Sequence, residues 1–197
     1  RLTTALGTGA VMLYQRDSGP DIAVVSAATP IVVLGPRLTT TTVPSREVRA
    51  LLAHAVELTR PEHIAFAGLT FEDASRLVAS VARLFGPPIL REAAINLVDD
   101  LDLQRGHDEM VKAALSVRIR TRLEQLLLPL APFQLDPARY LAACHRTADR
   151  AALLLDGDPL TIARGCTARG EGTAHLVAAV AQPGWQPLRA KLGIGPR

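Results

Sequence analysis

Residues 51–58 come close to spelling a zinc-binding helix. They read Leu-Leu-Ala-His-Ala-Val-Glu-Leu, and the histidine is His54. In the pattern H-E-x-x-H, two histidines one helical turn apart hold zinc, and the glutamate beside the first is the general base. Ala55 stands at the position of that glutamate, and Leu58 stands at the position of the second histidine. Alanine cannot take a proton and leucine cannot bind zinc. The segment therefore keeps only one of the three reactive groups of the motif, the first histidine.

Three further residues extend this candidate site. Glu57 follows His54 by three residues and therefore lies on nearly the same face of a helix. His145 and Asp149 are one turn apart in a later segment. His54, Glu57 and His145 would offer two nitrogens and one carboxylate, which is a reasonable zinc set. The alternative is that His54 is a hydrogen-bonded interior residue and that Glu57 is solvated.

Other residues that could do chemistry lack suitable neighbours in the sequence. Cys144 and His145 are adjacent, and adjacent helical residues point about 100° apart, so they do not form a catalytic pair. The acidic stretch at 99–102 lacks the spacing of a calcium loop and indicates a solvated turn. The remaining histidines have no partners at ligand spacing, and the first of them is expected in a surface turn: His63, His107 and His175.

The elements that would position these residues are a short β-rich part and a longer helical part. Ile22–Val25 and Ile31–Leu34 are β-branched runs separated by a few residues, which predicts a hairpin. From Ser45 the spacing changes to three and four residues, which predicts a helix through Thr59. Thr70 is expected to cap a helix that ends near Phe85.

Further helices are expected along the rest of the chain, and the residues from Gly184 onward are expected to form a tail anchored by Trp185. Asp136-Pro137 is a cap followed by proline at the first helical position, a typical helix start. The expected ranges are 61–67, 108–128, 136–155, 159–164 and 173–181. The fold class is therefore α+β, with a small N-terminal antiparallel hairpin or sheet packed on a predominantly helical domain. We expect one domain over 1–197, made of a β-rich part (1–40), a helical part (45–182) and a tail (183–197).

The order of these motifs resembles the prenyl-protease and heat-shock-protease family of zinc metallopeptidases, the gluzincins. The segments 31–38 and 47–54 look like the family's strand and metal-binding helix. Ala148-Asp149 matches the end of a family motif that resembles E-x-x-A-D. The resemblance covers roughly residues 10–165 and implies a zincin-like domain.

Position by position, the resemblance implies lost catalysis. His54 occupies the first-ligand position, while Ala55 and Leu58 replace the base and the second ligand. His145 stands where a glutamate ligand is expected, and Asp149 matches the residue that orients a ligand. We therefore expect no catalytic residue, no cofactor and no bound metal, with His54, Glu57, His145 and Asp149 as vestigial or rewired candidates. Zinc is expected only under the alternative of a rewired site.

Composition limits the partners. The chain has 197 residues, 48% of them hydrophobic and 4% aromatic, so the core must be built mainly from alanine, leucine and valine. The net charge is only +3, and the arginines of the chain form no basic run interleaved with aromatics. Nucleic-acid binding is therefore not expected. No apolar run reaches membrane-spanning length. Two cysteines are too few for a disulfide scaffold and indicate a reducing, cytoplasmic setting.

These patterns together favour a non-catalytic, peptidase-like domain. The sequence begins without methionine, and its Arg- and Ala-rich usage is typical of a GC-rich genome. We expect a fragment of a larger bacterial protein, acting as an interaction or structural module that contacts other domains of its parent or a protein partner. Two alternatives stay open: a zinc-dependent hydrolase with a rewired ligand set, and an unrelated helical binding module.

Overall fold

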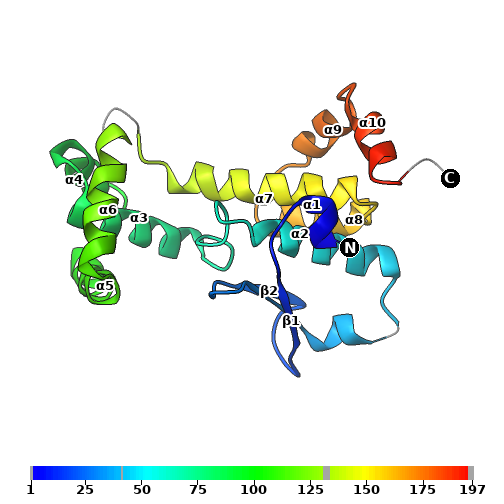
Figure 1. Cartoon of the computed structure of the whole chain (residues 1–197), viewed down its shortest axis with the longest axis horizontal. Coiled ribbons are helices and arrows are strands. Elements are labelled where there is room, and N and C mark those ends of the chain that lie inside the picture. The colour runs from blue at the N-terminus through cyan, green and yellow to red at the C-terminus, as the bar shows by residue number, and fades with distance from the viewer. Residues whose placement is uncertain (1, 41, 131–133, 195–197) are drawn as a thin grey trace. The chain divides into compact units, whose positions relative to one another are not determined.

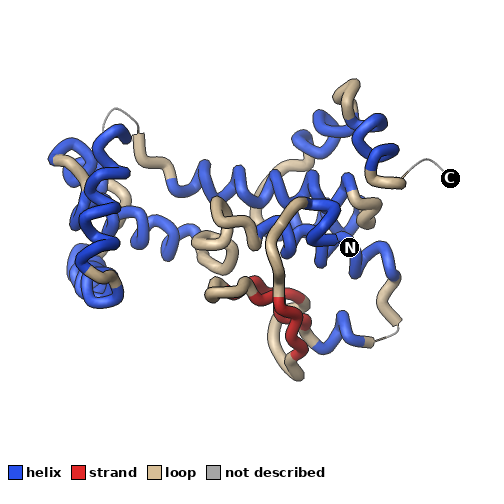
Figure 2. Tube along the Cα trace, viewed as in Figure 1, coloured by secondary structure: helices blue, strands red, loops and turns tan. Residues whose placement is uncertain are grey.

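The structure is a computed structural model that describes residues 2–40, 42–130 and 134–194. Within these residues the chain forms three short strands and ten α-helices, and Figure 2 shows the strands gathered in one small region. The α+β class with a small sheet and a helical bulk is thus confirmed. The chain divides into two compact units, one made of 1–68 with 142–197 and the other of 69–141. The expectation of a single domain stays a prediction.

The first unit contains the sheet, coloured blue in Figure 1. The expected hairpin is present: β2 (Ile22–Val25) pairs antiparallel with β3 (Ile31–Leu34), and Val24 faces Val32 in the register. The strand β1 (Met12–Gln15) adds in parallel on the other side of β3, giving the order β1-β3-β2. The sheet is therefore mixed, because β1 runs parallel to β3 and β2 runs antiparallel to it.

The helices of the first unit surround α2 (Ser45–Leu58). This helix contacts β2, and its alanines pack with residues of α7 (Pro137–Leu154) and α8 (Pro159–Ala168). Residues of α7 up to Leu141 belong to the second unit. Two short helices lie near the C-terminal end, α9 (Ala174–Val180) and α10 (Trp185–Lys191), and α1 (Leu2–Leu6) lies at the other end.

Small side chains dominate the core between α2 and its neighbours. Ala50, Ala53 and Ala152 are at most 1% exposed and pack with Leu155 and Cys166. A core of alanines allows helix backbones to approach closely, because little side-chain volume separates them. This explains how a chain with so few aromatic residues builds a packed interior.

The described residues of the second unit form helices and turns without a strand, and most of these helices have recognisable caps. Thr70 caps α3, as expected, because its side chain accepts a hydrogen bond from the Asp73 amide. The Asp100 side chain caps the first turn of α5, so part of the acidic stretch begins a helix. The helices of this unit are α3 (Phe71–Phe85), α4 (Pro88–Ile95), α5 (Leu101–Ala114) and α6 (Val117–Leu127).

Two expected helices and the expected tail differ from the structure. The single helix expected over 108–128 is two helices, because Leu115 is extended and the Ser116 hydroxyl caps α6 through the Ile119 amide. Residues 61–67 form successive turns, in which the amides of His63, Phe66 and Ala67 bond to carbonyls three residues back. The expected tail contains α10, in which Pro187 lies in the first turn, where no amide hydrogen is needed. Trp185 is buried there, as an anchor should be.

A close approach at Gly157 generates a stability prediction. A Cβ atom on Gly157 would lie 2.7 Å from the Ala152 carbonyl oxygen and 2.8 Å from the Ala50 Cα atom. We expect Gly157→Ala to lower the free energy of unfolding by about 1–3 kcal/mol, because backbone must shift to admit the methyl group. Urea unfolding followed by the fluorescence of Trp185, the single tryptophan, measures the change.

Gly9→Ala is the matched control for this substitution. Nothing lies within 4 Å of a Cβ atom at Gly9. We expect the control to change stability by no more than about 0.5 kcal/mol. Equal effects of the two variants would contradict the close packing of α2 against the turn after α7.

Candidate functional site

The candidate site is built around the buried carboxylate of Asp149 on α7. Its side chain is 2% exposed, and both of its oxygens have partners. Oδ1 lies 2.9 Å from Nδ1 of His54 on α2, and Oδ2 lies 2.5 Å from Nη2 of Arg169. The α2 and α7 segments that carry His54 and Asp149 therefore face each other within the first unit.

Two more side chains approach the same oxygen, Oδ2. The Cys166 thiol on α8 donates to it over 3.3 Å, and Nε2 of His175 on α9 lies 3.4 Å from it. The sequence placed none of these groups in the site: His175 was expected to lack partners, and Cys166 and Arg169 were not linked to Asp149. They follow Asp149 by 17 to 26 residues, so only the fold brings them together.

Charge compensation sets the state of the carboxylate. Burial alone would raise the pKa of Asp149, but the hydrogen bond from His54 and the charges of His54 and Arg169 outweigh it, so this pKa lies below its ordinary value. Burial raises the pKa of the Cys166 thiol to about 11, and its hydrogen bond to Asp149 adds to the shift. The site at neutral pH is thus a carboxylate surrounded by proton donors.

His145 contacts the other side of His54. Its Nδ1 atom lies 3.4 Å from Nε2 of His54, and the two rings stack with their centroids 5.5 Å apart. Burial and the charge of His54 lower the pKa of His145 to about 4. His145 is therefore uncharged at neutral pH.

Glu57, the third candidate ligand, does not join this pair. Its side chain is buried, and Oε1 accepts a hydrogen bond of 2.5 Å from Nε of Arg60. Among the described residues, the one group of three His, Cys, Asp or Glu side chains whose ligand atoms all lie within 4.8 Å of one another is Asp149, Cys166 and His175. The combination of His54, Glu57 and His145 is not such a group.

The residues do not fit the zinc centre that the resemblance implies. Leu58 is 4% exposed and packs against Cys144 and Ala148, so hydrocarbon fills the place of the second ligand. Ala55 is also buried at the place of the base. The described residues give His54 and His145 no third ligand atom within reach.

A separate polar network lies in the second unit, among α3 and α5. The Ser80 hydroxyl donates to Asp108 over 2.7 Å and lies 2.9 Å from Nδ1 of His107, while the Gln104 amide donates to both Ser80 and Asp108. Ser80 has no exposed surface, so its hydroxyl cannot reach a substrate. The network therefore ties α3 to α5.

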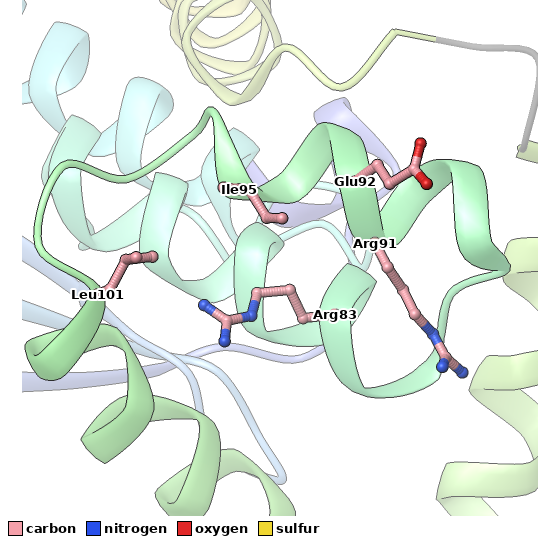
Figure 3. A pocket seen from close by; sticks show the side chains of 5 residues that line it. All are labelled: Arg83, Arg91, Glu92, Ile95 and Leu101. Carbon is pink, nitrogen blue, oxygen red and sulfur yellow. The ribbon is translucent and has the colours of Figure 1, made fainter.

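A hollow of about 300 Å³ in the second unit lies beside this network. Figure 3 shows that the guanidinium groups of Arg83 and Arg91 point in different directions. Arg83 contacts Asp108 over 3.4 Å, and Arg91 donates to the Gly86 carbonyl. These arginines are thus engaged within the fold and do not converge on a common point in the hollow, which Glu92, Ile95 and Leu101 also line.

Comparisons with known proteins add no assignment. No protein-family model, curated protein or solved structure matches this chain. None of the helices that the structure describes is both long and apolar enough to cross a membrane.

The lowered pKa of His145 predicts a loss of stability in weak acid. The pKa is about 4 in the folded state and 6.5 in the unfolded chain, so between these values the unfolded chain binds a proton that the folded protein does not. Stability therefore falls as the pH is lowered from 7 toward 4. Partial exposure of the ring reduces the full effect to about 1–2 kcal/mol.

The comparison of wild type with His145→Gln isolates this contribution. Urea unfolding followed by Trp185 fluorescence should show the wild type losing about 1–2 kcal/mol more than the variant between pH 7 and about pH 4.5. The pKa of Asp149 does not enter, because it lies below this range. Parallel losses in the two proteins would show that His145 ionises freely in the folded state.

Proposed function

We propose that this chain is a non-catalytic, gluzincin-like domain that serves as a structural or interaction module of a larger bacterial protein. The observation that carries the proposal is the contact of 2.9 Å between His54 and Asp149. A carboxylate on the outer nitrogen of a histidine is how metal-binding histidines are commonly oriented. The resemblance requires this contact between two segments that are 95 residues apart in the sequence.

The same site supports the absence of peptidase chemistry. Hydrolysis at a zinc centre needs about three protein ligands and a group that takes the proton of the zinc-bound water. Ala55 and Leu58 supply neither, and both are buried against the body of the unit. In place of a reactive zinc centre, this unit contains a charged network in which Asp149 and its partners hold one another in fixed positions.

A groove in the first unit supports the interaction role. It has a volume of about 540 Å³, and apolar side chains of α7, α9 and α10 make up much of its lining. Arg150 is exposed at this groove, beside Arg60. Apolar hollows rimmed by charge are typical of surfaces that contact other chain segments. Cys144 and Cys166 are buried thiols that are not joined in a disulfide, which fits our proposal of a reducing, cytoplasmic location.

An assay of purified protein tests the lack of catalysis. We expect no peptidase activity on an unfolded substrate such as casein, with or without added Zn²⁺, because the base and the second ligand are missing. His54→Ala should leave this background unchanged. Zinc-dependent peptidase activity that His54→Ala abolishes would sink the proposal and favour a rewired enzyme.

A single substitution tests the resemblance itself. Leu58 follows His54 by one helical turn, so Leu58→His should place a third imidazole beside His54 and His145. We expect this variant to bind one more equivalent of Zn²⁺ than the wild type, and to be stabilised by it in thermal unfolding. Adding His54→Ala should remove the extra equivalent.

Leu58→Gln is the matched control, since it also buries a polar group but offers no imidazole. It should show neither the extra zinc nor the zinc-dependent stabilisation. A folded Leu58→His protein with no additional metal would mean that α2 and α7 are not arranged as in a zinc peptidase.

A further inference from the structure

The group of Asp149, Cys166 and His175 lies on the opposite side of the carboxylate from His54. Its three ligand atoms are a carboxylate oxygen, a sulfur and an imidazole nitrogen, all within 4.8 Å of one another. The two pairs that share Oδ2 are separated by 3.3 Å and 3.4 Å. Tetrahedral zinc with ordinary bond lengths places neighbouring sulfur, nitrogen and oxygen ligands about 3.3–3.5 Å apart.

The tautomer of His175 makes the separation of 3.4 Å between its Nε2 atom and Oδ2 of Asp149 unusual. Its Nδ1 atom lies 3.1 Å from the Gly172 carbonyl oxygen, which can only accept, so Nδ1 carries the proton. In the neutral ring Nε2 then presents a lone pair to the Asp149 carboxylate. The side chain is 10% exposed, and Nε2 has no hydrogen-bond partner among the described residues. A lone pair facing a carboxylate oxygen in a buried site calls for a positive charge between them.

A second proton on His175 would be the simplest such charge, but the geometry argues against it. Hydrogen bonds from imidazolium to carboxylate are about 2.7–2.9 Å long. Nε2 lies 3.4 Å from Oδ2, and the two groups do not meet hydrogen-bond geometry. The two atoms therefore share no hydrogen bond in this geometry, and a cation between them would satisfy both.

Other buried atoms around the group also lack partners. Nε of Arg169 and Oε2 of Glu171 have no hydrogen bond within the described chain. Nη2 of Arg169 lies 2.5 Å from Oδ2 of Asp149 and 3.8 Å from the Cys166 sulfur, so a positive charge already sits against two of the three ligand atoms. Three buried polar atoms without a hydrogen bond in one small region point to a site that can take a ligand.

We propose that Asp149, Cys166 and His175 bind one zinc ion, with water as the fourth ligand. Thiolate and imidazole together select zinc over the harder divalent cations. The Gly172 carbonyl would orient His175, and His54 would orient Asp149, as outer partners of zinc ligands do. When the sulfur–zinc bond forms, the proton of Cys166 leaves to solvent.

Arg169 gives way to the metal in this proposal. It caps the C-terminal end of α8 and precedes Gly170, whose φ of +73° lets the chain turn there. Its side chain is 24% exposed, and Oε2 of Glu171 lies 3.7 Å from its Nη2 atom. Zinc would move the guanidinium from Asp149 to Glu171, which satisfies the unpartnered oxygen. Arg169 and zinc therefore compete for one carboxylate.

The test uses Co²⁺ as a spectroscopic substitute for zinc, on the whole chain after treatment with a chelator. We expect one equivalent of Co²⁺ to bind with a sulfur-to-cobalt charge-transfer band, and Zn²⁺ to displace it. The band reports a cysteine ligand directly, independent of any activity. A folded wild-type protein that develops no such band overturns the proposal.

Variants locate the site. Cys166→Ser should lose the band, and His175→Gln should weaken binding by more than the roughly 10–100-fold that losing an outer partner costs. Cys144→Ser and His145→Gln are the matched controls and should bind as the wild type does. Arg169→Gln should bind roughly tenfold or more tightly, because a competing cation is removed.

One result separates this proposal from the rewired site considered above. Metal that is lost in His145→Gln but kept in His175→Gln would place the ion between His54 and His145 and overturn the assignment. Zinc bound through Cys166 without peptidase activity leaves the non-catalytic function intact, so the two proposals fail separately.

Discussion

The buried charge of Asp149 is the constraint on which the first unit depends. An uncompensated carboxylate in a protein interior costs several kcal/mol, so the elements that bring its partners must stay in place. His54 comes from α2, Cys166 from α8 and His175 from α9, while Arg169 ends α8. A single side chain on α7 thereby ties together helices that the sequence separates. Such a network fixes the relative positions of these helices more closely than apolar contacts, which tolerate sliding.

The alanine-rich core makes this arrangement possible. Ala50 and Ala53 on α2 and Ala152 on α7 are buried, and the turn after α7 brings Gly157 onto Ala50. Small residues let α2 and α7 approach until imidazole and carboxylate meet directly. The same packing includes Ala55 and Leu58, which are both buried in the interior.

Local signals were enough for much of the fold. The hairpin, α2, α3 and α7 follow from β-branched runs, helical spacing and the caps at Thr70 and Asp136. The break at Ser116 was missed because apolar spacing continues across it, although a serine before a helical run is itself a start signal. The helix at Trp185 was missed because Pro187 and the neighbouring glycines suggested a tail. In the first case the apolar spacing outweighed a local start signal, and in the second the proline and glycines outweighed the helix.

The candidate site also has residues that the sequence pointed to and residues that it did not. His54, His145 and Asp149 could be singled out because the order of their segments resembles that of a zinc metallopeptidase. Cys166, Arg169 and His175 could not, because nothing in their own segments points to a carboxylate on another helix. Glu57 was expected to be either a ligand or solvated, and it is buried beside Arg60, three residues later on the chain. That spacing is the signal for a pair along a helix, and it was present in the sequence.

The two oxygens of Asp149 allow one side of the site to change while the other is kept. Oδ1 holds His54, and this contact does not require metal on the far nitrogen of that histidine. Oδ2 accepts hydrogen bonds from Cys166 and Arg169 and faces Nε2 of His175 on the other side. The carboxylate can therefore serve His54 through one oxygen and other groups through the second. Both sides leave the buried negative charge of Asp149 in place. That charge still needs a cation, and within the first unit Arg169 and a zinc ion are alternative ways to supply it.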